Sequence, residues 1–202
     1  MKIERILVSS MVLAALCMPV VQAQSDTNGT TPPPTVQQRK KNQQDRIANG
    51  VQSGQLTAGE TKNLENKEAN LNKEDRNMRA GDNGKLTAAD RSRLNWQQNR
   101  LSNEIYQDKH NANTAHYANG EIGQRREDQQ DRIAQGIRSG QLTPGEASKV
   151  ENKEQGVNRE VKGMRQANGG KLTNADRKAV NQQQNKLSNQ IYNKKHNAKK
   201  GY

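Results

Sequence analysis

The sequence predicts an all-α protein that contains two tandem three-helix modules, and three observations lead to this prediction. Residues 43–112 recur without a gap as residues 129–198, with 42 of the 70 aligned residues identical, so the chain contains one module twice. Each copy holds two phrases in which a Thr is followed three residues later by an acidic residue, the pattern of a capping box at a helix start. The apolar residues after each phrase are spaced as on one face of a helix.

Residues 1–23 have the composition of a signal peptide. A charged start is followed by an apolar run and then by small residues at Val21 and Ala23. The run contains Ser and Pro and is short for a membrane span, so cleavage between Ala23 and Gln24 is favoured over a retained anchor. We therefore expect a periplasmic or secreted chain with no stable membrane insertion after processing. Cys17, the only cysteine, falls in this leader, so the mature chain has no disulfide and no thiolate ligand.

Residues 24–35 are rich in Thr, Gln and Pro and are predicted to form a disordered linker. A hydrophobic content of 29% with a high net charge is also found in disordered chains. Four repeated helix starts favour a folded chain beyond this linker. The two helical repeats are expected at residues 36–112 and 125–202, with residues 113–124 as a second linker.

Each repeat is expected to hold three helices joined by two Gly-containing turns. In the first repeat a short helix covers about residues 36–49, and further helices begin after Thr57 and Thr87. In the second repeat the capping residues are Thr143 and Thr173, and Pro directly after Thr143 suits the first helical position, where its missing amide hydrogen costs nothing. The predicted core positions are Leu64, Leu71, Met78, Leu94, Leu101 and Ile105 in the first repeat, and Val150, Val157, Val161, Met164, Val180, Leu187 and Ile191 in the second.

The turns resemble the loops of EF-hands over about 70 residues per copy. If a twelve-residue loop begins at Asn49, Gly54 is sixth and Glu60 twelfth, and a second loop that begins at Arg79 ends at Asp90. The resemblance implies paired helix-loop-helix units in which Leu56 and Leu86 form a short bridge. Tandem degenerate units of this kind are similar to exported bacterial proteins of unknown function.

The ligand positions of these loops do not fit calcium. The first position should be an oxygen donor, and the third position should also supply one. The residues found are Asn49, Arg79, Gln135 and Arg165 at the first position, and Val51, Gly81, Ile137 and Ala167 at the third. We predict no metal site and no cofactor, and keep a calcium-responsive module as an alternative.

The charge of the chain points to an anionic partner. With 33 basic and 21 acidic residues the net charge is +12. It is still +11 without the two basic residues and the one acidic residue of the leader. Residues 36–120 hold 14 basic and 10 acidic residues, and residues 121–202 hold 17 and 9, so contact with an anionic glycan or another polyanion is expected in the second half. The candidate contacts are Lys194, Lys195, Lys199 and Lys200, although lysines at a helix end also suit its dipole.

Aromatic residues make up only 2% of the chain, which leaves little surface for stacking bases. No specific nucleic-acid contact is therefore predicted, and non-specific nucleic-acid binding stays as an alternative. Trp96 is replaced by Gln182 in the other copy and is expected to be a partly buried local contact.

The sequence shows no nucleophile paired with a base, so it gives no indication of an enzyme. His110 and His196 are expected to meet the carbonyls that end their helices. The acidic residues fall into two classes. Glu60 and Glu146 are explained as helix caps, and Glu65, Glu68, Glu74 and Glu151 are interpreted as solvated residues on polar helix faces. We therefore expect a non-enzymatic, exported structural or interaction protein whose basic surface contacts anionic envelope polymers.

Overall fold

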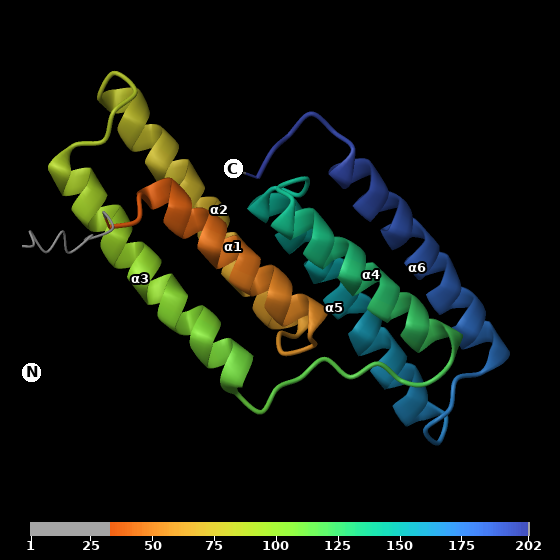
Figure 1. Ribbon diagram of the computed structural model, residues 1–202. Helices are drawn as coiled ribbons and strands as arrows, with labels where there is room; N and C mark the ends of the chain where they lie inside the picture. The colour runs from red at the N-terminus through yellow and green to blue at the C-terminus, as the bar shows by residue number, and fades with distance from the viewer. Residues whose placement is uncertain (1–32, 202) are drawn as a thin grey trace, which may run out of the picture. The chain divides into compact units, whose positions relative to one another are not determined.

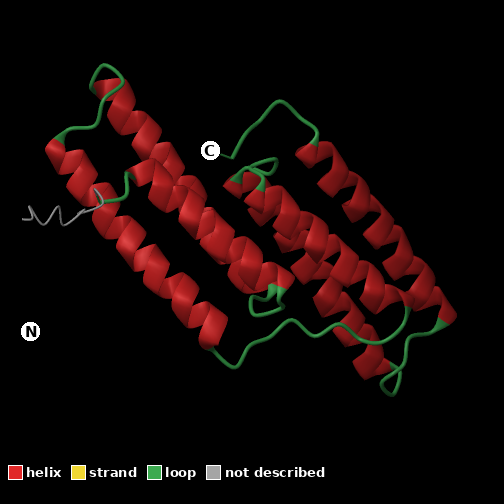
Figure 2. Cartoon of the chain, viewed as in Figure 1, coloured by secondary structure: helices red, strands yellow, loops and turns green. Residues whose placement is uncertain are grey.

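The computed structural model describes residues 33–201, and this range is helical apart from its turns and connections (Figures 1 and 2). The all-α prediction is confirmed for this range. The predicted signal peptide, its cleavage site at Ala23 and Gln24, and nearly all of the first linker lie outside it. None of the described helices is both long and apolar enough to span a membrane. The helices are α1 (Val36–Gln52), α2 (Ala58–Gly81), α3 (Ala88–His110), α4 (Glu121–Arg138), α5 (Pro144–Ala167) and α6 (Asn174–Lys195).

The predicted helix starts at Thr57, Thr87, Thr143 and Thr173 are confirmed, because each Thr accepts a hydrogen bond from the third amide of its helix. In each case the acidic side chain at that third position accepts a hydrogen bond from the Thr amide. Thr35 caps α1 in the same way with Gln38 as its partner. Such caps satisfy amides that would otherwise lack a partner.

The fourth helix begins without a side-chain cap. Gly120 precedes it and has a φ of 103°. This backbone conformation favours glycine. The helix starts at Glu121, so the last four residues of the predicted linker 113–124 are helical. A Cβ atom on Gly123 would lie 1.6 Å from the carbonyl oxygen of Ala118, so only glycine fits where the connection folds back on the helix.

Helices from the two halves of the described chain pack together. α2 packs along α5 and α1 along α4, and these four helices surround a shared interior. α3 lies against α1 and α2, while α6 lies against α4 and α5 (Figure 1). α2 and α5 are antiparallel, because Asn66 meets Ser148, whereas the later residue Ala69 meets the earlier residue Gly145. The described helices belong to one compact unit.

The two halves make the same internal contacts. Gln43 Nε2 donates to the carbonyl oxygen of Gln98 at 2.7 Å, and Gln129 Nε2 donates to that of Gln184 at 2.8 Å. In both halves the buried glutamine of the third helix donates in turn to the first helix. Buried amide groups of this kind cost free energy unless they are paired. The glutamines therefore recur at the same spacing in both copies because they pair buried polar groups where the helices pack.

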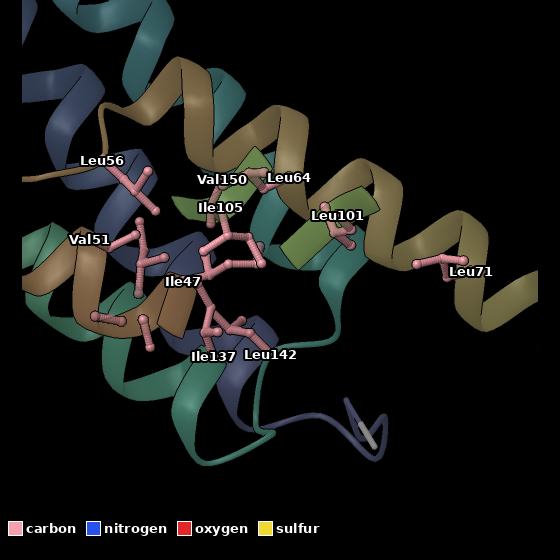
Figure 3. Close-up of a cluster of buried hydrophobic side chains, with 14 of the residues drawn as sticks. Ile47, Val51, Leu56, Leu64, Leu71, Leu101, Ile105, Ile137, Leu142 and Val150 are labelled. Atoms are coloured by element: carbon pink, nitrogen blue, oxygen red, sulfur yellow. The ribbon is translucent and has the colours of Figure 1, made fainter. Parts of the chain in front are cut away.

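Side chains from both halves form one main hydrophobic core (Figure 3). Ile47, Leu64 and Ile105 from the first half pack with Ile137 and Val150 from the second. A smaller cluster joins α4, α5 and α6 near the turn after α5. The predicted apolar positions are buried, except that both methionines are only partly buried. The smaller cluster consists of Ile122, Val157, Val161, Leu172 and Val180, with Met164 against it.

The expected bridge between Leu56 and Leu86 is not formed. Leu56 is buried in the turn before α2 and Leu86 lies in the turn after it. A continuous helix of 24 residues separates the two turns, a length of roughly 36 Å. Leu56 instead packs on Gly50, where an added Cβ atom would lie 2.7 Å from its side chain.

Candidate functional site

The structure separates the four lysines that the sequence grouped as polyanion contacts. Lys194 lines a groove beside α5, whereas Lys195 Nζ donates to Gln135 Oε1 on α4 at 2.8 Å. Burial, and then the charge of Arg132, lower the pKa of Lys195. Lys199 and Lys200 are exposed on the tail beyond α6. Of these four lysines, only Lys194 therefore lines that groove.

The groove has a volume of about 550 Å³ and lies between α2, α5 and α6. Two contacts between α2 and α5 lie at the groove: Ser148 Oγ donates to Asn66 Oδ1 at 2.6 Å, and Lys62 Nζ donates to Gln155 Oε1 at 3.1 Å. No carboxylate lines the groove, so its walls are cationic. They are formed by Lys62, Asn66, Ser148, Lys149, Asn152, Lys153, Gln190 and Lys194. Of the groove lysines, the sequence pattern indicates Lys194 alone, because the others come from two different helices.

At the four positions of the first half that match Lys149, Lys153, Gln190 and Lys194, the net charge is −1 instead of +3. We call Lys149, Lys153, Gln190 and Lys194 the lysine flank; the same positions in the first copy, which we call the acidic flank, hold Asn63, Lys67, Glu104 and Asp108. On the acidic flank, Lys67 is paired with Glu104. Burial, then Glu60 and Glu104, raise the pKa of Asp108. The two flanks therefore present opposite electrostatic environments on similar backbones.

The interior between the four central helices contains four buried carboxyl groups. Glu65, Glu68 and Glu151 are fully buried and Glu154 is 1% exposed. The interpretation of Glu65, Glu68 and Glu151 as solvated residues is therefore wrong. Their spacing places them on the inward face of α2 and α5 beside Leu64 and Val150. Glu74 does lie at the surface side of α2, paired with Arg93 at 2.7 Å.

These carboxyl groups have few partners. Gln44 Nε2 donates to both oxygens of Glu65, at 3.3 and 3.2 Å, and Gln130 Nε2 donates to Glu151 at 3.1 Å. Both oxygens of Glu68 and one oxygen each of Glu151 and Glu154 lack a hydrogen-bond partner. Unpaired buried charge is costly, so such groups take up protons.

The pKa shifts follow from this burial. Burial raises the pKa of Glu68 to about 8 despite the charge of Lys40, and that of Glu154 to about 7 despite Arg126. Burial, assisted by the charge of Glu154, raises the pKa of Glu151 to about 8. The pKa of Glu65 is well above its usual range through burial and then through Glu68 and Glu151. The four groups therefore form a coupled array whose two ends lie near cations.

The groups considered for metal or catalytic roles have other partners. Glu60 Oε2 accepts from Thr57, and its Oε1 accepts from Asn111 and Asn113. His110 Nδ1 lies 2.7 Å from the carbonyl oxygen of Tyr106, and the equivalent contact recurs at His196, as expected for residues at a helix end. In the part of the chain that the structure describes, no three His, Cys, Asp or Glu side chains are grouped to hold a metal ion.

Trp96 is 58% exposed, so the expectation of a partly buried contact is wrong. The guanidinium of Arg100 lies 4.8 Å from the centre of its ring. Both residues border a separate pocket of about 260 Å³ between α2 and α3, over Leu71 and Leu101. The aromatic ring is therefore outside the groove with the lysine flank.

Comparison with known proteins found no matching family model, no matching curated protein and no matching solved structure. A function for the chain therefore rests on the geometry and charge of its own residues.

Proposed function

We propose that this chain is an exported, non-enzymatic interaction protein of two tandem three-helix modules, which binds anionic envelope polymers on a basic surface. The observation that carries the proposal is the groove in which Lys62 joins three lysines of the lysine flank without a lining carboxylate. Cationic clefts with low-dielectric walls concentrate anions and speed their association. The composition of residues 1–23 and the net charge of +12 support an extracytoplasmic polyanion as the partner.

An anionic glycan fits the groove better than a nucleic acid does. The groove is lined by Lys, Asn, Ser and Gln side chains, which can bind charged groups and hydroxyls. It contains no aromatic ring on which a base could stack, and stacking supplies much of the affinity of single-strand binders. Trp96 borders a different pocket. The proposal therefore commits to an anionic polysaccharide, and nucleic-acid binding is an outcome that the test can reveal.

Replacing the exposed lysines Lys149 and Lys153 by Gln should weaken heparin binding about tenfold or more at low salt, because two of four groove charges are lost. For the wild-type protein, four charge contacts predict roughly a 50-fold loss of affinity between about 50 and about 200 mM salt. The matched control replaces Lys171 and Lys178, which are exposed outside the groove, by Gln. Fluorescence titration should show a small effect for this control. Equal losses in both variants, or affinity that does not depend on salt, would argue against the groove.

The calcium-responsive alternative rests on Glu60 and Glu146 at the twelfth loop position. Both oxygens of Glu60 already accept hydrogen bonds from Thr57 and two asparagines, so a calcium ion would have to displace these contacts. We expect calorimetric titration with calcium to give no saturable heat. A saturable heat that disappears in the Glu60→Gln variant would revive the alternative.

A further inference from the structure

The two flanks of the face formed by α2 and α5 differ in charge at matching positions. Three of the four matching positions differ: lysine at 149 and 194 replaces Asn63 and Asp108, and Gln190 replaces Glu104. The fourth position is lysine in both halves, but only Lys67 is paired with a carboxylate. The positive charge of the groove is therefore confined to one side of the face.

The charges of the two flanks also act on neighbouring acids. On the acidic flank, burial and the neighbouring carboxylates Glu60 and Glu104 raise the pKa of Asp108. Beside the lysine flank, burial favours a higher pKa for Glu146, but bonds from Asn197 and Thr143, with the charge of Lys194, lower it. An anion that approaches the acidic flank meets unfavourable potential, while one that approaches the lysine flank meets favourable potential.

We infer that each chain binds one polyanion strand, along the lysine flank, and that Glu104 and Asp108 exclude the strand from the acidic flank. This inference rests on the proposed function. The duplication by itself would suggest two equivalent sites and a bivalent contact. Repulsion at one copy removes the second site and fixes the side on which the strand lies.

Exchange of the charges between the flanks tests the inference. A loss variant carries Lys149→Asn, Gln190→Glu and Lys194→Asp, which place the first-copy residues on the lysine flank. An exchange variant adds Asn63→Lys, Glu104→Gln and Asp108→Lys, and its net charge equals that of the wild type. Both are titrated with a heparin octasaccharide by calorimetry, and circular dichroism melts check that the variants fold.

A control variant separates local charge from net charge. The control carries Lys85→Gln, Lys171→Gln, Arg177→Gln and Lys178→Gln, which lower the net charge by four, the same change as in the loss variant. Residue 178 lies about 18 Å along α6 from Gln190, at 1.5 Å per residue. The control should retain most of the wild-type affinity.

We expect one octasaccharide per wild-type chain, a loss of affinity of about tenfold or more in the loss variant, and recovery to within about threefold in the exchange variant. Two octasaccharides per wild-type chain, or an exchange variant as weak as the loss variant, would overturn the inference while the proposed function stands. A wild-type chain that binds neither heparin nor single-stranded DNA would refute the proposed function itself. If the chain preferred the DNA, the proposed partner would be a nucleic acid and not a glycan.

Discussion

The free energy of unfolding is expected to fall by several kcal/mol as the pH is raised from about 5 to about 8. The cause is the buried array of Glu65, Glu68, Glu151 and Glu154, whose pKa values are raised in the folded chain, to about 8 for Glu68 and Glu151. In the unfolded chain these carboxyls titrate near 4.5. Between the two values the folded state binds more protons than the unfolded state, so stability decreases with rising pH.

The direction of the stability change and the pH range in which it occurs follow from these pKa values. The stabilising effect of the protonated array is fully present below about pH 4.5 and is lost as the pH rises through 7 to 8. Each proton that the folded state keeps and the unfolded state releases is worth about 1.4 kcal/mol per pH unit, so one retained proton is sufficient for a change of several kcal/mol between about pH 5 and 8. Because small domains have only about 5–15 kcal/mol of stability, the melting temperature should fall by roughly 10 °C or more.

Other carboxyls act in the opposite direction at low pH. Burial favours a higher pKa for Asp75, but Lys40 at 2.9 Å and Arg79 at 2.8 Å outweigh it and lower the pKa. The stabilisation that Asp75 gains from Lys40 and Arg79 is present above the pKa of Asp75 in the unfolded chain. It is lost as the pH falls through the lower pKa of the folded chain. Maximum stability is therefore expected near pH 5.

Urea unfolding at about pH 5, 7 and 8.5 tests the array. The double variant Glu68→Gln and Glu154→Gln keeps the side-chain shapes but cannot ionise, so its stability should change less with pH and exceed that of the wild type at pH 8.5. The control is Glu127→Gln, an exposed carboxyl on α4, which should follow the wild-type curve. If the wild-type stability is constant from pH 5 to 8.5, the array is hydrated and the prediction is wrong.

The sequence predicts the helix starts well because the interactions are local. Thr57 and Glu60 are three residues apart and recognise each other within one turn. The same locality explains the failure at Glu65 and Glu68. Their burial depends on α5, which lies about 80 residues away in the chain, and polar residue types are poor indicators of a buried position. The available signal was the Glu-x-x-Glu spacing beside Leu64, kept in both copies.

The candidate site shows the same limit. Lys194 and Lys195 are adjacent in sequence, yet successive helix positions are about 100° apart, so one lines the groove and the other contacts α4. Lys62 joins the groove only because α2 packs along α5. The charge asymmetry between the copies was visible in the sequence. Its concentration on one face was not, because the face is assembled from three helices.

The isolated first half, residues 33–117, is expected not to fold as a monomer, whereas the whole chain should melt in a single transition. The main core contains Ile133, Ile137 and Val150 from the second half, packed against Ile47 and Leu64. Removing the second half would expose the apolar faces of α1 and α2 to water. The free energy lost with this apolar burial would be comparable with the entire stability of a domain of this size. Circular dichroism and sedimentation equilibrium on each half measure this directly.

Mixing the two halves, residues 33–117 and 118–201, should restore helix content and give a one-to-one complex. Because association buries Glu65, Glu68, Glu151 and Glu154 together, the complex should be tighter near pH 5 than near pH 8, in the same direction as the stability of the intact chain. The pH dependence should be reduced when both halves carry Gln at positions 68 and 154. A first half that is monomeric, helical and cooperatively folded would show that the shared interior contributes little. Association independent of pH would show instead that the array keeps its water in the complex.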